Sequence, residues 1–356
     1  MPAKDRFKHL KANVPSLVLP AKKTSPLPPI VDLPDATTIQ IDDKSVKLSK
    51  TELYDVSEIG RGQFGQVNKM THMVTGKVMA VKRIRVTPDQ AKSKSLLMEW
   101  KVPKNSVECP YTILFYGAFF CENDVWICME LMDRSLEELY HLVYDKLKES
   151  IPELVIGKMA LSTLKALTYL HDKLNVMHRD VKPSNILINQ NGEIKLCDFG
   201  IAGELVDSLA KTDIGCRPYL APERIDEPQH EYDHRSDVWS LGITMYEIAM
   251  GEFPYPVDTL RSIFGLIEMI VKGSPPRLTS DRFSGEHKDF VAQCLTKSRD
   301  SRPRYKDLNA HSFIQTIENT GVDMHCWYTT ILTKYNDDLP PDKTEPSATN
   351  VPELVS

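Results

Sequence analysis

The segment His178-Arg179-Asp180-Val181-Lys182-Pro183-Ser184-Asn185 is the most informative part of this chain. It is followed by Asp198-Phe199-Gly200 and then by Ala221-Pro222-Glu223. Each tripeptide can occur by chance, but the ordered series at these spacings is very specific. The short polar side chains of the series could simply cap loops. Because they all lie in register with the motif order, the series instead indicates a catalytic loop and a second functional loop after it.

A glycine-rich segment lies upstream, Gly60-Arg61-Gly62-Gln63-Phe64-Gly65. Glycines let backbone amides approach phosphates closely. Alone, this pattern is weak evidence, because a mobile turn or the loop between strand and helix of a Rossmann fold would look similar. Val67 and the strand-like stretch after it indicate a flap of strand, loop and strand.

The next informative residue is Lys82, at the end of the apolar run Val78-Met79-Ala80-Val81-Lys82. Ala80 and Lys82 share one face of the predicted strand. A lysine in an apolar strand is usually an edge or snorkelling residue. Its distance from the glycine-rich loop favours contact with the α- and β-phosphates of a nucleotide. Glu99, on a helix predicted at 93–102, is the candidate acidic partner, although it could be an ordinary solvated helix residue.

The residue pattern changes from strand-like to helical along the chain. Apolar runs at 113–118 and 125–129 flank a polar turn and predict a hairpin. Beyond Met132, apolar and small residues recur at helical spacing. The stripe consists of Ile156, Met159, Ala160, Thr163, Leu164 and Leu167. A strand-rich part followed by a helix-rich part predicts an α+β fold with two lobes.

These patterns suggest four regions. We expect residues 1–51 to be a mostly disordered arm, because the segment is rich in Pro, Lys, Thr and Asp and has few aromatic residues. A small β-rich N-lobe is expected at 52–132 and a larger helical C-lobe at 133–315. Residues 316–356 form a C-terminal tail, and its proline-rich end is expected to be disordered.

The composition excludes several classes of protein. The 356 residues are 41% hydrophobic and 26% charged, as in an ordinary globular protein. No run approaches the roughly 18 apolar residues that cross a bilayer, and the net charge of −5 does not suggest a nucleic-acid partner. The seven cysteines show no metal-type spacing. Reduced thiols in a cytoplasmic or nuclear protein are the plain interpretation.

The block from Tyr54 to Phe313 resembles the protein-kinase catalytic domain, a fold with a small β-rich and a larger helical lobe. Within that superfamily it resembles a MAP kinase kinase. The resemblance is carried by the segments 79–85 (MAVKRIR), 125–132 (VWICMELM), 195–200 (KLCDFG) and 215–225 (GCRPYLAPERI). The stretch 251–274 lacks the proline-rich insert of the mitogen branch, so the chain looks closest to the stress branch, which activates p-thirty-eight type MAP kinases. The resemblance implies an enzyme that phosphorylates Thr and Tyr in a Thr-x-Tyr loop.

The kinase signature also implies roles for individual residues. Asp180 would accept the proton of the substrate hydroxyl, and Asn185 and Asp198 would hold Mg²⁺ on the ATP phosphates. Lys182 would steady the γ-phosphoryl group as its charge redistributes.

Other residues are assigned to the adenine site or to the scaffold. By the same resemblance Met129 is the gatekeeper, and Glu130 and Met132 form the hinge whose backbone would bind adenine. His178 is expected to pack behind the catalytic loop. Asp237 is expected to hydrogen-bond the backbone of that loop, and an ion pair is expected between the two residues Glu223 and Arg302.

The segment 207–212 (DSLAKT) resembles the loop in which an upstream kinase phosphorylates Ser and Thr, here Ser208 and Thr212. Arg179, beside Asp180, is a cation that could bind such a phosphate. Ordinary loop hydroxyls are the alternative. Asp213-Ile214 separates Thr212 from Gly215, one residue fewer than the stress branch leads us to expect, which weakens the assignment of Thr212.

Two segments resemble docking sites. Lys8 and Lys11 precede the apolar pair Leu17 and Leu19, as in the peptide with which such kinases grip a downstream MAP kinase. A chance pattern in a disordered arm is the alternative. Residues 308–332 match the position of a docking segment for the upstream MAP kinase kinase kinase.

Two other functions remain open on the sequence alone. A pseudokinase or scaffold would bind partners without catalysis, but the intact Lys82, Asp180, Asn185 and Asp198 argue against it. A kinase specific for Ser and Thr would use the same catalytic loop, because only the resemblance adds tyrosine.

Overall fold

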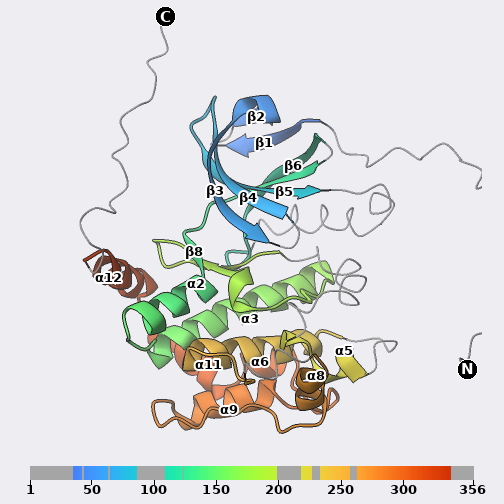
Figure 1. Cartoon of the computed structure of the whole chain (residues 1–356), viewed down its shortest axis with the longest axis vertical. Helices are drawn as coiled ribbons and strands as arrows, with labels where there is room; N and C mark the ends of the chain where they lie inside the picture. The colour runs from blue at the N-terminus through green and yellow to red at the C-terminus, as the bar shows by residue number, and fades with distance from the viewer. Residues whose placement is uncertain are drawn as a thin grey trace, which may run out of the picture.

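A computed structural model describes residues 35–41, 44–62, 65–85, 109–122, 124–198, 218–226, 233–256 and 263–337. Figure 1 shows a twisted β-sheet stacked on a larger helical part, with the chain passing between them at the end of strand β7 (Asp124–Met129). The α+β fold with a small β-rich and a larger helical part, predicted from the sequence, is therefore confirmed.

The sheet has five antiparallel strands in the order β3-β4-β5-β7-β6. The strands are β3 (Leu53–Gly62), β4 (Gly65–His72), β5 (Val78–Arg85), β6 (Phe115–Cys121) and β7. The glycine-rich segment lies at the turn from β3 to β4, so the predicted flap of strand, loop and strand is confirmed. The register pairs Val67 with Lys82, and Ala80 with Met129.

The structure differs from the sequence prediction in part of the N-terminal arm. Within residues 1–51, expected to be mostly disordered, strands β1 (Thr37–Ile41) and β2 (Lys44–Leu48) form a hairpin. Buried Ile39 and Leu48 join the apolar cluster on one face of the sheet. The composition of the whole arm concealed this local apolar pattern, because the hairpin gains its burial from the sheet it covers and not from its own residues.

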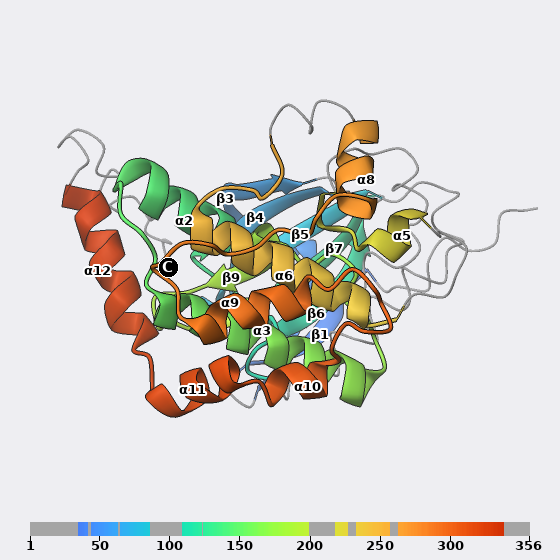
Figure 2. The same ribbon diagram turned by 90° about the horizontal axis from the view of Figure 1, so that it is seen from below.

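Helices α3 (Glu153–Leu174) and α6 (Arg235–Met250) lie at the centre of the helical part, as Figure 2 shows from below. The predicted stripe is confirmed, since all six of its residues are buried on α3. The other helices are α2 (Leu136–His141), α5 (Pro222–Asp226), α8 (Ile263–Val271), α9 (Gly285–Cys294), α10 (Tyr305–Asn309), α11 (Ser312–Thr320) and α12 (Met324–Asp337). A π-helical turn, η4 (Leu142–Lys146), continues α2.

A small sheet in the order β10-β9-β8 lies between the two parts of the molecule. It consists of β8 (Arg134–Ser135), β9 (Ile186–Ile188) and β10 (Ile194–Leu196), and the short 3-10 helix η5 (Pro183–Asn185) precedes β9. The loop 178–185 therefore leads directly into β9 of this small sheet.

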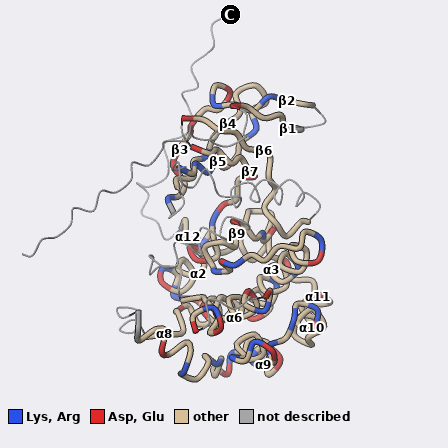
Figure 3. The backbone as a smooth tube through the Cα atoms, turned by 90° about the vertical axis from the view of Figure 1, so that its right-hand side faces the viewer, with Lys and Arg blue, Asp and Glu red and all other residues tan. Residues whose placement is uncertain are grey.

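Two further observations concern the chain as a whole. Basic and acidic positions are interspersed over the sheet and the helical part (Figure 3). Among the residues described, no helix combines the length and the apolar character needed to span a membrane.

Candidate active site

The loop 178–185 is fixed from below by a buried carboxylate on α6. Asp237 accepts hydrogen bonds from the backbone N–H groups of His178 (2.8 Å) and Arg179 (2.7 Å), and from the Tyr305 hydroxyl (3.2 Å). Arg179 adopts a φ of 72°, a conformation that a non-glycine residue keeps only when its surroundings enforce it. The predicted role of Asp237 as a backbone anchor is confirmed.

His178 links this loop to the chain before Asp198. Its ring is fully buried, and Nε2 lies 2.8 Å from the carbonyl oxygen of Cys197. Because a carbonyl can only accept, Nε2 carries the proton, and Nδ1 accepts from the backbone N–H of Asp180 (3.3 Å). The ring therefore connects the backbone of Asp180 to the backbone of Cys197, the residue before Asp198.

Asp180 lies in a tight cluster of polar groups. Its Oδ2 is 2.8 Å from Nζ of Lys182. The amide nitrogen of Asn185 donates to the same Oδ2 (2.9 Å) and to the backbone carbonyl of Asp180 (2.7 Å). The sequence thus folds the loop back on itself, and one carboxylate, one ammonium group and one amide lie within hydrogen-bond reach.

A second ion pair lies on the opposite wall of the site. Nζ of Lys82 on β5 is 2.8 Å from Oδ1 of Asp198, and the lysine side chain is only 7% exposed. Burial alone would raise the pKa of Asp198, but the charge of Lys82 and its hydrogen bond outweigh burial and hold the pKa below its usual range. Asp198 is therefore a carboxylate at neutral pH.

These groups line one cavity of about 670 Å³ between the large sheet and the helical part. Its roof is formed by the strands on either side of the glycine-rich turn, and its floor by the loop 178–185. The predicted site residues in its lining are Gly60, Arg61, Gly65, Val67, Ala80, Lys82, Met129, Glu130, Met132, Asp180, Lys182, Asn185 and Asp198. Gly62 pairs with Gly65 at the rim.

Gly65 shows why a glycine is required at the end of the turn. It has a φ of 147°, and a Cβ atom at this position would lie 1.8 Å from the carbonyl oxygen of Arg83. Any side chain would push β4 away from β5 and open the roof of the cavity.

Glu130 has a structural contact that the sequence did not reveal. Its carboxylate pairs with Nζ of Lys195 on β10 (2.8 and 2.9 Å) and accepts from the backbone N–H of Leu114 (2.5 Å). The backbone N–H of Glu130 donates to the carbonyl of Leu114 (2.9 Å). The side chain thus fixes the segment 129–132 against the small sheet, and the backbone of that segment lines the cavity.

A buried ion pair supports the site from farther away. Arg302 is fully buried and contacts both carboxylate oxygens of Glu223, at 2.7 and 3.0 Å. It also donates to the carbonyl of Arg235 (2.8 Å). The predicted pairing of Glu223 with Arg302 is confirmed, and it ties the Ala-Pro-Glu segment to α6.

Several predicted residues lie outside the described part of the chain. These are Lys8, Lys11, Leu17, Leu19, Gln63, Phe64, Glu99, Ser208 and Thr212.

The cavity also includes lining residues that no motif marked, among them Leu187 on β9 and Tyr328 and Leu332 on α12. Only the apolar character of β9 could have suggested Leu187 from the sequence.

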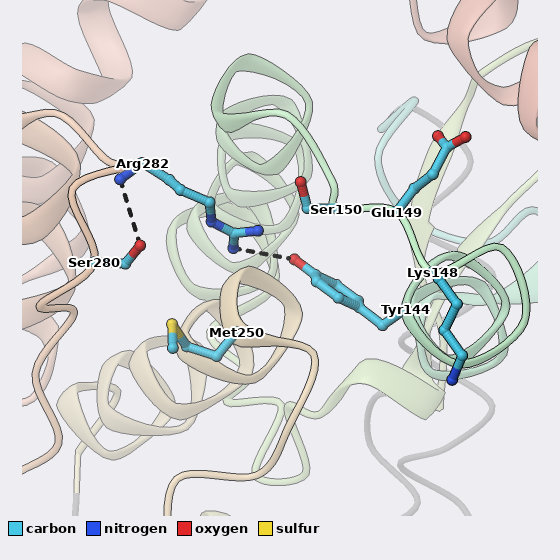
Figure 4. A pocket seen from close by; sticks show the side chains of 7 residues that line it. All are labelled: Tyr144, Lys148, Glu149, Ser150, Met250, Ser280 and Arg282. Carbon is cyan, nitrogen blue, oxygen red and sulfur yellow. Dashed lines mark hydrogen bonds between the residues drawn. The ribbon is translucent and has the colours of Figure 1, made fainter.

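A second hollow, of about 500 Å³, opens on the helical part (Figure 4). Arg282 and Tyr144 approach each other across it at 3.5 Å, and Arg282 also donates to the carbonyl of Ala249 (2.6 Å). Lys148 and Glu149 line the same hollow. Asp180 of the catalytic loop and Asp198 both lie in the other cavity, which is therefore the candidate active site.

Comparison with known proteins agrees with this geometry. Residues 53–314 match the family described as protein kinase domain. The dual specificity mitogen-activated protein kinase kinase sek-1 of Caenorhabditis elegans is 45% identical over 296 residues, which are 82% of this chain and 87% of that protein. Dual specificity mitogen-activated protein kinase kinase 7 of Homo sapiens and that of Rattus norvegicus are each 44% identical over 288 residues, which are 80% of this chain and 67% of theirs.

The fold and the cavity with its two ion pairs define a protein kinase. More narrowly, the chain belongs to the MAP kinase kinase family, and it is an ATP-dependent dual-specificity kinase.

Proposed function

We propose that this kinase transfers the γ-phosphoryl group of ATP to Thr and Tyr in the Thr-x-Tyr loop of a stress-activated MAP kinase. The observation that carries the proposal is the convergence of Asp180, Lys182, Asn185, Lys82 and Asp198 on one cavity below a glycine-rich turn. Phosphoryl transfer needs such positioned charges, because its catalysis is mostly orientation and electrostatic stabilisation.

In this proposal Asp180 accepts the proton of the attacking hydroxyl. Lys182 and Asn185 both contact Oδ2, so Oδ1 is the oxygen that would face the substrate. Lys182 would then stabilise negative charge on the phosphoryl group during transfer, because it lies directly beside Asp180, the residue that accepts the proton of the attacking hydroxyl. Lys82, held by Asp198, would contact the α- and β-phosphates.

The residues fit a magnesium ion. Asp198 is ionised, and the amide nitrogen of Asn185 is used in two hydrogen bonds, which leaves its oxygen as a ligand. A carboxylate and an amide oxygen, completed by phosphate oxygens and water, form the hard donor set that Mg²⁺ prefers. When bound, Mg²⁺ would neutralise phosphate charge, while the protein holds the two ligands through Lys82 and Asp180.

The stress branch is supported by the sequence, in which the stretch 251–274 lacks a proline-rich insert. The relatives are named as dual specificity MAP kinase kinases, which supports a MAP kinase as substrate. Lys8 and Lys11 with Leu17 and Leu19 would dock that substrate.

Activation would follow phosphorylation of Ser208 and Thr212 by an upstream MAP kinase kinase kinase, with 308–332 as its docking segment. Each added phosphate brings nearly two negative charges, and the cation of Arg179, next to Asp180, is suited to bind one of them. A cytoplasmic or nuclear site of action fits the cysteine content.

The test is transfer of labelled phosphate from MgATP by the full chain, phosphorylated at Ser208 and Thr212. Inactive MAP kinases of the stress type and of the mitogen type would be offered separately, and the labelled residues mapped. We expect label on both Thr and Tyr of the stress-type loop. Label only on Thr would favour a kinase specific for Ser and Thr. Label on the mitogen-type MAP kinase alone would overturn the assignment of this chain to the stress branch.

A pseudokinase or scaffold is the second candidate function. Mg²⁺-dependent ATP binding without turnover on any substrate would favour it, and an Asp180→Ala variant provides the background rate. We expect turnover well above that background.

A further inference from the structure

Helix α12 contributes to the nucleotide cavity although it lies beyond the kinase domain match, which ends at residue 314. Tyr328 and Leu332 both line the cavity. They are one helical turn apart and share a face of the helix. Figures 1 and 2 agree in placing α12 beside α2.

The helix is held on this edge along its whole length. Met324, Tyr328 and Ile331 are buried, at 4%, 0% and 3% exposure, and form its apolar face. At the first turn of α12, Nδ1 of His325 lies 2.5 Å from the carbonyl of Gln190, and Lys334 near its end pairs with Glu149 (2.6 Å). A helix fixed at both ends and along one face acts as a rigid wall.

The turn between β9 and β10 is fitted to the beginning of this helix. Gly192 has a φ of 76°, and a Cβ atom there would lie 2.4 Å from the backbone nitrogen of His325. The backbones of the turn and of α12 are therefore in direct contact, without an intervening side chain. The turn of the small sheet is therefore packed directly against the first turn of α12.

A hydrogen bond connects α12 to the segment that borders the adenine end of the cavity. Nε of Arg134 on β8 donates to the Tyr328 hydroxyl at 3.1 Å. Arg134 follows Asp133, whose backbone N–H donates to the carbonyl of Ile188 (3.0 Å). Met132, which lines the cavity, is the next residue upstream. Tyr328 is thus connected to the segment 132–134 by one hydrogen bond, in addition to lining the cavity itself.

We propose that α12 is a wall of the ATP site, and that Tyr328 and Leu332 are positioning residues that set the affinity for ATP. Leu332 limits the width of the cavity on the side of α2, and Tyr328 holds the segment 132–134 through Arg134. Neither residue takes part in the transfer of the phosphoryl group. The proposal rests on the ATP dependence of the kinase and is independent of the MAP kinase substrate.

The test compares Leu332→Ala and Tyr328→Phe with Thr333→Ala in the full chain. Thr333 is exposed on the same helix and does not line the cavity, so it is the matched control. Affinity for a fluorescent ATP analogue with Mg²⁺ is measured by titration, and the melting temperature is measured without nucleotide. The Kd and the KM for ATP are expected to rise about three- to tenfold in the two test variants, the scale of one lost hydrogen bond or a few lost apolar contacts, with kcat unchanged.

A third variant separates a loss of ATP affinity from a loss of stability, in case Tyr328→Phe destabilises the fold. Leu332→Trp adds bulk at a partly exposed position of the wall, so it should also raise the Kd while the melting temperature stays near that of Thr333→Ala. An unchanged Kd in both Leu332 variants would overturn the proposal. So would a loss of affinity that follows the loss of melting temperature in every variant, because that pattern belongs to a merely structural helix. Failure to phosphorylate a stress-type MAP kinase would leave this readout untouched.

Discussion

The two sides of the nucleotide cavity are built by different kinds of contact. The catalytic-loop side, formed by 178–185 and Asp198, consists of short polar contacts, such as that from Lys182 to Asp180. The hinge side, formed by 129–135 and α12, depends on buried apolar groups and on pairs that join remote parts of the chain. The difference suggests a division of labour, in which one side determines the rate of transfer and the other the affinity and the stability.

The largest effect should follow from a change on the catalytic-loop side. Asp180→Asn keeps the size of the side chain but removes the group that accepts a proton. We expect kcat to fall about 10²- to 10⁴-fold, the usual contribution of a positioned general base, while the affinity for ATP analogues is nearly unchanged. Steady-state kinetics and nucleotide titration on the same samples check this.

The matched control is Asp133→Asn on the hinge side, since Asp133 also lines the cavity. Its kcat should remain close to that of the parent kinase. A comparable loss of kcat in the control would contradict the division between the two sides.

The catalytic-loop side could be predicted from the sequence because its chemistry requires particular residue types at short, fixed separations. Asp180, Lys182 and Asn185 lie within one loop, and the structure brings them together as their spacing suggested. Asp198 could be assigned in the same way, because the Asp-Phe-Gly motif follows the catalytic loop in a fixed order.

The hinge side could be predicted only in part, because its contacts join residues that are far apart in the sequence. Glu130 and Lys195 are 65 positions apart, and Arg134 and Tyr328 are 194 positions apart. No periodicity or motif links such pairs, and only the folded chain reveals them. The hairpin 37–48 was overlooked for a related reason, since its apolar residues are buried only by the sheet.

A change of intermediate size should follow from breaking the hinge-side ion pair. Glu130→Gln leaves Lys195, whose side chain is only 10% exposed, without its main counter-charge. Because removing one partner of a buried pair is costly, we expect a loss of about 3 kcal/mol in the free energy of unfolding. Urea denaturation measures it, and the kcat of the folded fraction should change little.

The double variant Glu130→Gln, Lys195→Met sharpens this result. It removes the uncompensated charge, so part of the lost stability should return. If the single variant unfolds at the same urea concentration as the parent, the ion pair does not hold the hinge side. If its kcat falls as far as that of Asp180→Asn, the two sides are not separate.

The smallest effect concerns Glu247, a buried carboxylate on α6 that lies outside both sides and connects α2 with the residues before the Ala-Pro-Glu segment. It accepts hydrogen bonds from Tyr140 on α2 (2.7 Å) and from Tyr219 near the Ala-Pro-Glu segment (2.6 Å). Burial raises the pKa of Glu247, and the two hydroxyl groups offset this only in part. A carboxyl group with a raised pKa binds its proton more tightly in the folded state than in the unfolded state. Its ionisation therefore disfavours folding as the pH rises through the folded pKa.

Replacing Glu247 with Gln removes this titration and keeps a side chain that can contact both tyrosines. We therefore expect the parent kinase to gain stability relative to Glu247→Gln as the pH falls from neutral towards the ordinary pKa of a glutamate. Urea denaturation of both proteins at several pH values in this interval measures the difference. A Glu137→Gln variant, which changes a carboxylate on α2 near the same cluster, controls for the change of net charge. A difference that is constant with pH would mean that Glu247 acts only through its hydrogen bonds to Tyr140 and Tyr219, and that burial of its charge does not affect stability.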